Sequence, residues 1–304
     1  LYHDHKRGIT AGYAKFETFP IWNLPLKHPV NLAYEAATAD LNDVNMIDPF
    51  HLEAYSEKAV NYNRDVEIFP VLNATFQRIQ GHSPYQSPTD MGVNMVGNCI
   101  IDDEVCCEAS RKEILRRYYA ACVDHIRGKG SEQTIRKLEL VMNQAGVTPE
   151  IFPAVAAALN KAEETGAPAG AMVLTDGRII TGKTSSTLGA ASALLLNALK
   201  ALGGIDDSKH LIAAQVLEPI CELKTQYMGH SNPRLHTDEV LLALTISAMN
   251  DPAAQQAKEQ LKNLRGCEAH FSVILSEEDE QLLRCLGVHV SFEPRYESSR
   301  LYHK

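Results

Sequence analysis

The chain has 304 residues, of which 45% are apolar, and a formal net charge of −9 at pH 7, so it is long enough to bury about two hydrophobic cores. The negative charge disfavours nucleic acid or an anionic membrane as the main partner, because both attract basic surfaces. No apolar run reaches membrane-spanning length, and seven scattered cysteines, with Cys106 and Cys107 adjacent, indicate reduced thiols in a cytoplasmic protein.

Residues 1–100 are predicted to form a loop-rich α/β part. The chain begins with Leu1 rather than Met, and Leu1–Arg7 is typical of a helix end closed by Gly8, which predicts that the chain starts inside a larger protein. Frequent Asn, Asp and Pro predict long loops, which often carry binding surfaces. The predicted elements are strands at Tyr13–Trp22 and Tyr62–Leu72, the second passing into a helix through Ile79, a short helix at Ala33–Asp43, and loops at Leu24–Asn31 and Ser87–Asn98.

Residues 101–166 are predicted to form a helical subdomain, a small bundle of three helices packed by apolar stripes. Cap and stop signals set the helices at Asp102 or Asp103 to Gly128, Ser131 to Gly146, and Thr148-Pro149-Glu150 to Thr165. The inward positions of the first two helices are Val105, Ala109, Leu115, Tyr119, Cys122 and Ile126, then Ile135, Leu138, Val141, Met142 and Ala145.

The segment from Ala167 to Gly204 is a strand-turn-strand-helix unit that opens an α/β domain at 167–304. Ala171–Leu174 and Arg178–Thr181 are predicted strands joined at Asp176-Gly177, a strong hairpin signal. The segment also matches the P-loop pattern Gly177-x-x-x-x-Gly182-Lys183-Thr184, but a P-loop lies between a strand and a helix. Because the residues between the two glycines are strand-like, the hairpin is the favoured interpretation.

The rest of this domain is predicted to alternate helices and strands, which makes the chain as a whole a mixed α/β protein. A final strand-helix-strand order predicts a parallel pair with a right-handed crossover. The predicted elements are a helix at 189–202, a short strand at His210–Ile212, a helix to Met228, helices at Asp238–Met249 (capped by Thr237) and from Asp251-Pro252 to Leu264, a strand at His270–Leu275, a helix at 277–286 after Ser276, and a strand at Val288–Phe292.

Seven stretches resemble one bacterial family, the domain-of-unknown-function family 1846, also called uncharacterised protein family 0371. They are GYAKFETFPIWNLPLKHPVN (12–31), AYEAATADLNDVNMIDPFHLEAY (33–55), NYNRDVEIFPVL (61–72), SPTDMGVNM (87–95), TGKTSS (181–186), NPRLHTDEV (232–240) and GCEAH (266–270). The resemblance implies that this chain is the C-terminal two-thirds of a family member. It further implies that residues 1–100 complete a nucleotide-binding-like half that precedes Leu1.

A second resemblance is to the cytidine-deaminase-like fold. AGAMVLTDGRIITGKTSS (169–186), followed by a helix of small residues, is similar to the opening hairpin and first core helix of that three-layer α/β fold. In those enzymes this helix carries a zinc ligand and a catalytic Glu. Here the helix begins Gly189-Ala190-Ala191-Ser192-Ala193, so the resemblance implies the scaffold without the zinc ligands.

The loop after the hairpin is a predicted anion-binding segment. Thr181, Lys183, Thr184 and Ser185 precede the helix at 189, whose N-terminus favours negative charge. These four residues are therefore candidates for holding a cofactor or a phosphate group.

Arg234, His236, Asp238 and Glu239 are the predicted acid-base group. Thr237 as a helix cap, with acids in the first turn, accounts for Asp238 and Glu239 but leaves Arg234 and His236 unexplained. An alternative is that His236, with Cys267 and His270 of a C-x-x-H spacing, binds a metal at three positions. The paired spacing of most such sites is missing, so acid-base chemistry without a metal is the favoured hypothesis.

The N-terminal loops contain a second candidate group, in which Arg64 and Asp90 stand out. Each polar residue there is individually explained by a turn. Together they offer hard oxygen ligands for Mg²⁺ and a guanidinium for phosphate. The group is Asp40, Asp43, Asp48, His51, Arg64, Asp65, Asp90 and Asn94. Cys106 and Cys107 are read as packing thiols, although a helix N-terminus lowers a thiol pKa.

Two functional hypotheses follow from these patterns. The first is a cytoplasmic enzyme that acts on a phosphorylated or nucleotide-like small molecule between the N-terminal part and the α/β domain, with a nucleotide or Mg²⁺ as the cofactors to test. The alternative is a non-catalytic binding or assembly protein built on a deaminase-like scaffold. Under both hypotheses we expect the protein to form a homo-oligomer, and we expect neither nucleic acid nor membranes as partners.

Overall fold

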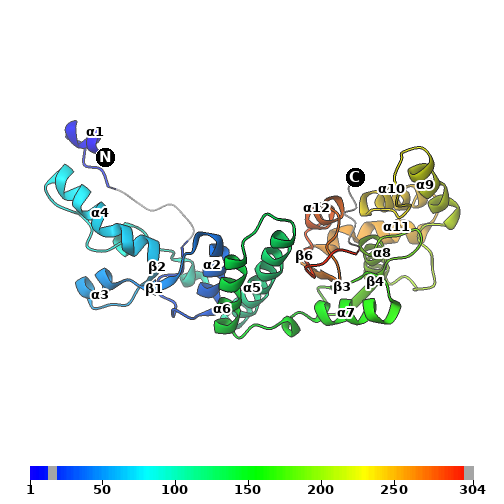
Figure 1. Ribbon diagram of the computed structural model, residues 1–304, viewed down its shortest axis with the longest axis horizontal. Helices are drawn as coiled ribbons and strands as arrows, with labels where there is room; N and C mark the ends of the chain where they lie inside the picture. The colour runs from blue at the N-terminus through cyan, green and yellow to red at the C-terminus, as the bar shows by residue number, and fades with distance from the viewer. Residues whose placement is uncertain (13–18, 298–304) are drawn as a thin grey trace. The chain divides into compact units, whose positions relative to one another are not determined.

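The computed structural model describes residues 1–12 and 19–297 (Figure 1). The chain divides into two compact units, and each is described by itself. The first comprises Leu1–Ala121 and Ser131–Thr148, and the second comprises Cys122–Gly130 and the chain from Pro149 onward.

The first unit is mainly helical, with one small sheet in which β1 and β2 pair antiparallel. Its elements are α1 (Tyr2–Lys6), α2 (Pro29–Ala37), η1 (Ala39–Leu41), β1 (Asn45–Ile47), α3 (Pro49–Tyr55), β2 (Val60–Tyr62), α4 (Asn63–Gln80), η2 (Thr89–Met91), η3 (Val96–Cys99), α5 (Asp103–Ile126) and α6 (Glu132–Ala145). The last residues of α5, from Cys122, belong to the second unit.

The predicted strand at Tyr62–Leu72 is wrong, because only β2 is extended and α4 follows at once. Within α4 the buried apolar side chains are Val66, Phe69 and Phe76, which recur at helical spacing. Pro70 lies inside this helix and is exposed. Local alternation of polar and apolar residues was outweighed by this longer helical pattern.

Other parts of the first unit differ from expectation in their bounds. Helix α2 begins at Pro29 rather than Ala33, because a proline suits the first helical position and His28 caps it. On α5, Val105, Ala109 and Ile126 are exposed, while Ile114 and Leu115 are fully buried, since apolar and polar residues are not cleanly separated on this helix. Most of the predicted strand at Tyr13–Trp22 lies outside the described residues, and Ile21 forms an isolated bridge with Asn94.

The second unit is an α/β domain around a four-stranded sheet of order β4-β3-β5-β6. Strand β3 is antiparallel to both β4 and β5. Strands β5 and β6 form the parallel pair that the sequence predicted. Its elements are η4 (Pro149–Ile151), α7 (Pro153–Thr165), β3 (Ala169–Val173), β4 (Ile179–Lys183), α8 (Ala190–Gly203), α9 (Ala214–Gln226), α10 (Thr237–Ser247), α11 (Pro252–Glu259), η5 (Gln260–Leu264), β5 (Glu268–Phe271), α12 (Glu277–Cys285) and β6 (His289–Phe292).

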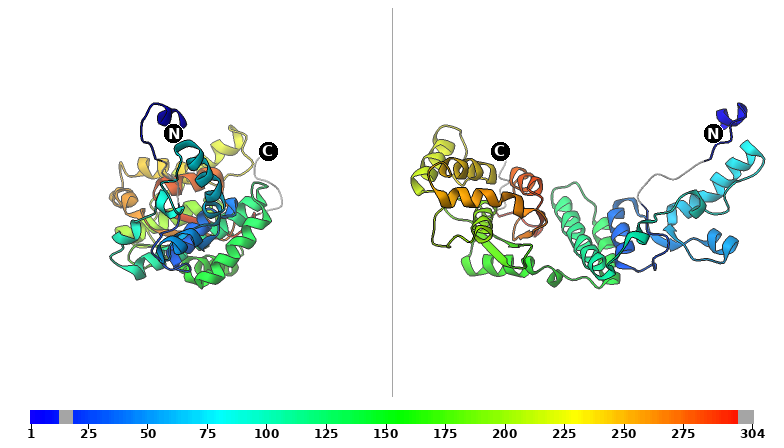
Figure 2. Two further views of the ribbon diagram at one scale, coloured as in Figure 1. Left: turned by 90° about the vertical axis from the view of Figure 1, so that its left-hand side faces the viewer. Right: turned by 180° about the vertical axis from the view of Figure 1, so that it is seen from behind.

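Helices cover both faces of this sheet. Ala171 packs with Ala154 and Ala158 of α7, whereas its neighbour Met172 packs in the large core with Leu194 of α8. Successive strand residues point to opposite faces, so α7 and α8 lie on different sides of the sheet. Figure 1 and the right-hand view of Figure 2 show the same arrangement around the β3–β4 hairpin. The predicted mixed α/β class is confirmed.

The β3–β4 hairpin is confirmed, and it excludes the P-loop interpretation. Leu174 N–H donates to Arg178 O at 2.9 Å across the turn, and Gly177 adopts φ +85°. Lys183 is the last residue of β4 and pairs with Ala169, so it does not stand on a helix after a phosphate-binding loop.

Two expectations about the second unit are wrong. Helix α7 packs on the sheet rather than completing a bundle with α5 and α6, and it begins at Pro153 after the short η4. His210–Ile212 is irregular, although Leu211 and Ile212 are buried. Their apolar character reflects packing in the core and not strand pairing.

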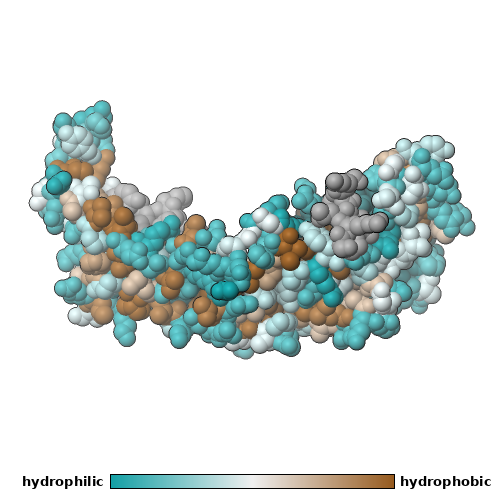
Figure 3. All heavy atoms as spheres, in the orientation of Figure 1, coloured by the Kyte–Doolittle hydropathy of each residue, from teal (hydrophilic) through white to brown (hydrophobic). Residues whose placement is uncertain are grey.

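The surface of the described residues is mixed in character. On the face shown in Figure 3, apolar residues form small groups among hydrophilic ones. Within the described ranges, none of the helices combines the length and apolar character needed to cross a bilayer. All seven cysteines lie in the described residues, and none of them forms a disulfide.

Candidate functional site

One edge of the second unit brings the starts of α8 and α10 together. Leu188, in the loop after β4, forms a parallel bridge with Leu235, two residues before α10. Leu235 N–H donates to Thr187 O at 2.8 Å, and Ser192 Oγ of α8 donates to Leu235 O at 2.8 Å. The predicted anion-binding loop and the predicted acid-base segment are therefore hydrogen-bonded neighbours.

His236, the N-cap residue of α10, is paired with a buried carboxylate of α12. Its Nδ1 lies 3.0 Å from Asp279 Oδ2, and Thr237 N–H donates to Asp279 Oδ1 at 2.8 Å. Ser276 Oγ donates to Asp279 Oδ2 at 3.1 Å. An ionised carboxylate only accepts, so Nδ1 carries the hydrogen and Nε2 holds the lone pair of the neutral ring. Among the described residues Nε2 has no hydrogen-bond partner, and the side chain is 35% exposed.

Pairing shifts the pKa values of His236 and Asp279 in opposite directions. The hydrogen bond to Asp279 raises the pKa of His236 above its ordinary 6.5, an effect that burial only partly offsets. Burial raises the pKa of Asp279, but the hydrogen bond and charge of His236, together with hydrogen bonds from Thr237, outweigh burial and bring that pKa below 3.8. His236 is thus held as a proton donor and acceptor with one ring nitrogen facing outward.

The Asp279→Asn variant should lose stability in a pH-dependent way. The His236 contribution is complete below pH 6.5 and is lost as the pH rises through its raised folded-state pKa. The Asp279 contribution is complete above pH 3.8 and is lost as the pH falls through its lowered pKa. We therefore expect a loss of about 1–2 kcal/mol near pH 6 and a smaller loss near pH 9 in urea unfolding. Asp238→Asn is the control, and an equal loss at both pH values would contradict the assignment.

Glu239 has a structural position rather than a free carboxylate. Its Oε2 accepts from His236 N–H at 2.8 Å and pairs with Lys224 Nζ at 2.7 Å. Lys224 is 1% exposed and also donates to Arg234 O at 2.8 Å. Asp238 is exposed, and its Oδ1 accepts from Glu239 N–H. Glu239 is thus occupied by structural contacts. His236, whose Nε2 is open, is the predicted acid-base residue best suited to proton transfer.

Arg234 connects this segment to a cleft of about 690 Å³ in the same unit. Arg234 Nη1 lies 2.7 Å from Glu297 Oε1, and Glu297 lines the cleft together with Ser272 and Arg295. Ser272 and Arg295 follow β5 and β6, the two parallel strands, and ligands of α/β sheets commonly bind outside such strand ends. Neither His236 nor Asp279 is among the residues that line the cleft.

The four predicted anion-binding residues lie at the end of β4 and just after it. Lys183 and Ser185 are exposed, whereas Thr184 is buried and its N–H donates to Pro168 O at 2.8 Å. Ser185 Oγ accepts from Leu188 N–H at 3.0 Å. Thr181 contributes its carbonyl oxygen to Asn197 Nδ2 at 2.9 Å. Lys183 is therefore the charged side chain of this loop that faces solvent.

Cys267 and His270 lie in the core of the second unit. Burial raises the pKa of the Cys267 thiol, whose Sγ donates to Asn263 O at 3.8 Å. His270 is fully buried, with Nδ1 2.8 Å from Ser291 Oγ and Nε2 3.2 Å from Glu293 Oε1. Within the described ranges, these two residues and His236 do not form a cluster with metal-binding spacing.

The N-terminal candidates have local structural partners within the first unit. Arg64 Nη2 lies 3.4 Å from Asp43 Oδ2, and Asp90 accepts from Tyr55 OH at 3.0 Å and from Gln86 N–H at 2.8 Å. Asp48 caps α3, and its Oδ2 accepts from Thr89 Oγ1 at 2.6 Å. Asn94 Nδ2 donates to Phe19 O. These contacts fit the turn and cap roles that each residue type favours.

Two residues of the site were missed at the level of sequence. Asp279 was read only as part of the Ser276-x-x-Asp279 cap of α12, a signal that does not reveal the partner from α10. Lys224 lies in the middle of α9 and gave no signal, because a lysine in an amphipathic helix is normally exposed. Both depend on contacts across the fold.

Comparison with known proteins covers the whole chain. Residues 1–146 match the family described as "Domain of unknown function DUF1846, N-terminal", and residues 150–302 match its C-terminal counterpart. The chain is 59% identical over 304 residues to the UPF0371 protein of Corynebacterium efficiens and 57% identical to that of Streptococcus uberis. All of the chain is covered in both cases, but only 61% and 62% of the relatives' length. By these matches, the chain belongs to the DUF1846 family of UPF0371 proteins.

Proposed function

We propose that the second unit acts as an acid-base enzyme on a phosphorylated or nucleotide-like small molecule, with His236 as the proton-transferring residue. The observation that carries this proposal is the His236–Asp279 pair, in which Nδ1 is fixed by a buried carboxylate while Nε2 is open. A ring oriented in this way can accept a proton at Nε2 and return it, with the resulting charge stabilised by Asp279.

Binding of an anionic group is supported by two cationic side chains of the second unit and by the helix starts at the edge that carries His236. Lys183 and Arg295 are cationic, and α8 and α10 both begin at this edge, where partial positive charge favours anions. Arg295 donates its Nε–H to Ser272 O at 2.7 Å, which fixes the guanidinium at the cleft. We propose that a phosphate held here anchors a molecule whose reacting group reaches the outward nitrogen of His236.

We propose a deaminase-like scaffold for this site and a cytoplasmic location for the protein. The β3–β4 hairpin followed directly by α8 supports the scaffold. At the start of α8, Gly189–Ala193 contains none of the ligand types of a zinc deaminase, so the proposed proton transfer relies on His236. Cysteines without disulfides are consistent with a reducing compartment.

The test is a titration of the full chain with inorganic phosphate, ribose 5-phosphate, AMP and ADP, each with and without Mg²⁺. We expect at least one of them to raise the melting temperature and to shift the imidazole resonances of His236 in an NMR spectrum, because the ligand changes the field at Nε2. His289→Gln, which removes an exposed histidine, should leave both signals unchanged, whereas His236→Gln should remove the imidazole signal. If none of these compounds produces either shift, the proposal fails.

A second candidate function, non-catalytic assembly as a homo-oligomer, is favoured by an exposed apolar surface on α10 and the turn that follows it. Leu242 and Ile246 lie one turn apart on α10, and Met249 lies in the turn just after it; they are 67%, 58% and 80% exposed. Stripes of this kind mark association surfaces. Analytical ultracentrifugation of the same samples distinguishes this candidate, since assembly raises the measured mass with or without the phosphorylated compounds.

A further inference from the structure

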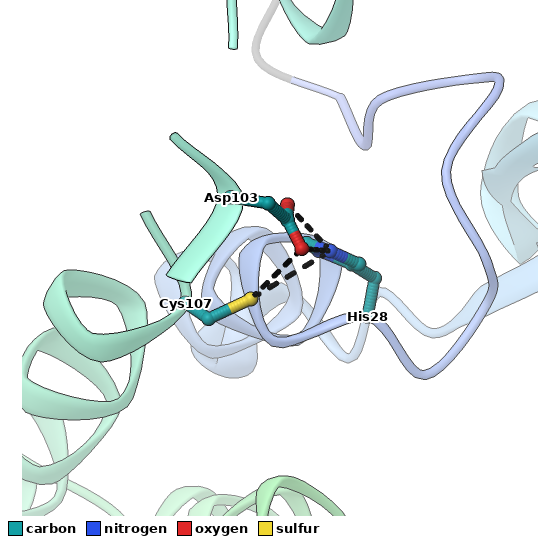
Figure 4. Close-up of side chains that lie close together, drawn as sticks. All are labelled: His28, Asp103 and Cys107. Carbon is teal, nitrogen blue, oxygen red and sulfur yellow. Dashed lines mark hydrogen bonds and ion pairs between the residues drawn. The ribbon is translucent and has the colours of Figure 1, made fainter. Parts of the chain in front are cut away.

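Three side chains of the first unit that share no sequence motif meet at one point. His28 caps α2, while Asp103 and Cys107 lie one turn apart on α5. Figure 4 shows the imidazole, carboxylate and thiol pointing toward one another. His28 Nε2 is 3.3 Å from Asp103 Oδ2, and Cys107 Sγ is 3.7 Å from each of these two atoms. Each of the three residues offers one potential metal-ligand atom, and these atoms all lie within 4.8 Å of one another.

The triangle formed by these atoms has the dimensions of three corners of a zinc tetrahedron. With the usual bond lengths from zinc to sulfur, nitrogen and oxygen, tetrahedral angles place S and N about 3.6 Å apart, S and O about 3.6 Å, and N and O about 3.4 Å. The corresponding separations in the structure are 3.7, 3.7 and 3.3 Å. A single ion could therefore reach all three atoms with only small side-chain adjustments.

Hydrogen bonds to Asp103 account for two of the three contacts. The neutral imidazole offers one proton, the thiol offers one, and an ionised carboxylate offers none. Two protons cannot bridge three contacts, so one of the three is not a hydrogen bond. His28 Nε2 also lies 3.1 Å from the other oxygen of Asp103, so the carboxylate faces the ring with both oxygens.

Burial and donor type determine what kind of ion fits. Cys107 is buried, the side chain of His28 is 12% exposed, and that of Asp103 is 62% exposed, so the cluster opens to solvent on the side of Asp103. A thiolate and an imidazole select zinc and similar metals over Mg²⁺ and Ca²⁺, which prefer oxygen ligands. Three protein ligands with a solvent-facing side leave a fourth position for water.

We propose that His28 Nε2, Cys107 Sγ and the Asp103 carboxylate bind Zn²⁺, with water as the fourth ligand. This site lies in the first unit and is independent of the function proposed for the second. Burial raises the pKa of Cys107, contrary to the lowering expected from a helix N-terminus, and the ion would replace the thiol proton. One proton is released from Sγ to solvent, and the imidazole proton moves from Nε2 to Nδ1.

This proton shift has a structural consequence at the start of α2. Val30 N–H donates to His28 Nδ1 at 3.3 Å, a long bond that is lost when Nδ1 becomes a donor. The helix retains Pro29, which has no N–H to satisfy, and the bond from Leu32 N–H to His28 O at 3.0 Å. The Val30 amide is therefore a specific reporter of zinc binding.

The test is metal titration of the full chain after treatment with a chelator. Co²⁺, used as a spectroscopic probe, should give a thiolate-to-cobalt charge-transfer band that Zn²⁺ removes, and one equivalent of Zn²⁺ should shift the Val30 amide resonance. Cys107→Ser should weaken Zn²⁺ binding by at least about 100-fold, since even outer-shell changes weaken metal binding by 10–100-fold. His28→Gln should weaken it similarly, and Mg²⁺ should produce no signal.

Cys106→Ser is the matched control, because Cys106 is the adjacent thiol and does not belong to the cluster. It should bind Zn²⁺ as the unchanged chain does. Circular dichroism checks that each variant is folded. Absence of the thiolate band, or equal Zn²⁺ binding by Cys107→Ser and Cys106→Ser, overturns the proposal.

Discussion

Replacing Glu239 with Ala should lower the free energy of unfolding by about 3 kcal/mol, one of the largest effects that we expect from a single side chain. Lys224 Nζ is buried and has two partners, Glu239 Oε2 and Arg234 O. Removing the carboxylate leaves a buried ammonium with a single carbonyl. The expected loss is at the lower end for buried pairs because the side chain of Glu239 is 23% exposed. Urea unfolding at neutral pH measures it.

Two further variants separate this effect from the loss of any surface charge. Asp238→Ala removes the neighbouring exposed acid and should change the unfolding free energy by less than about 0.5 kcal/mol. Lys224→Met combined with Glu239→Leu removes both charges and should recover most of the stability, because no unpaired charge remains. If Glu239→Ala is as stable as Asp238→Ala, the ion pair has no structural role, and Glu239 regains its place as an acid-base candidate.

Gly182→Ala should cost about 3 kcal/mol, because β4 lies directly against the backbone of α8 at this position. A Cβ on Gly182 would come within 2.2 Å of Leu194 N and 2.4 Å of Leu194 Cα. These are backbone atoms in the middle of a buried helix and cannot rotate away. Thermal and urea unfolding should both report the loss, and the measured value includes any shift of α8 along the sheet.

Gly189→Ala is the matched control for this substitution. Gly189 also lies beside α8, but its φ of −68° suits any residue, and a Cβ would be 3.7 Å from Leu235 O. We expect a change of about 1 kcal/mol or less, reflecting the weaker capping by Ala. Similar losses for the two variants would show that the β4–α8 contact is looser than the structure indicates. The glycine of the Gly182-Lys183-Thr184 string is thus explained by helix packing and not by phosphate binding.

Elements with local boundary signals could be predicted from the sequence. Ser131 and Gly146 bound α6, Ser276 and Gly287 bound α12, and Asp176-Gly177 marks the hairpin. Each signal acts through the hydrogen bonds or φ angle of the same few residues. The Tyr62–Leu72 prediction failed because its outcome depended on which face of α4 is buried, a property set by distant parts of the unit.

The candidate site could be predicted only in part, for the same reason. His236 and the segment Thr181–Ser186 stood out by residue type, and the bridge between Leu188 and Leu235 joins the chain just after that segment to the residue before His236. The partner that orients His236 comes from α12, 43 residues away, and no spacing in the sequence indicates that pair. The cluster of His28 with Asp103 and Cys107 joins residues 75 and 79 positions apart and was equally hidden.

The central position of β3 has a consequence for how the second unit folds. β3 can pair with β4 as soon as the hairpin has been synthesised, but its other neighbour is β5, and Ala169 N–H donates to Ser272 Oγ 103 residues later. During synthesis one side of β3 therefore remains an unpaired edge, of the kind that promotes aggregation. Such distant pairing also slows folding. We expect newly made chains to depend on chaperones until β5 has docked.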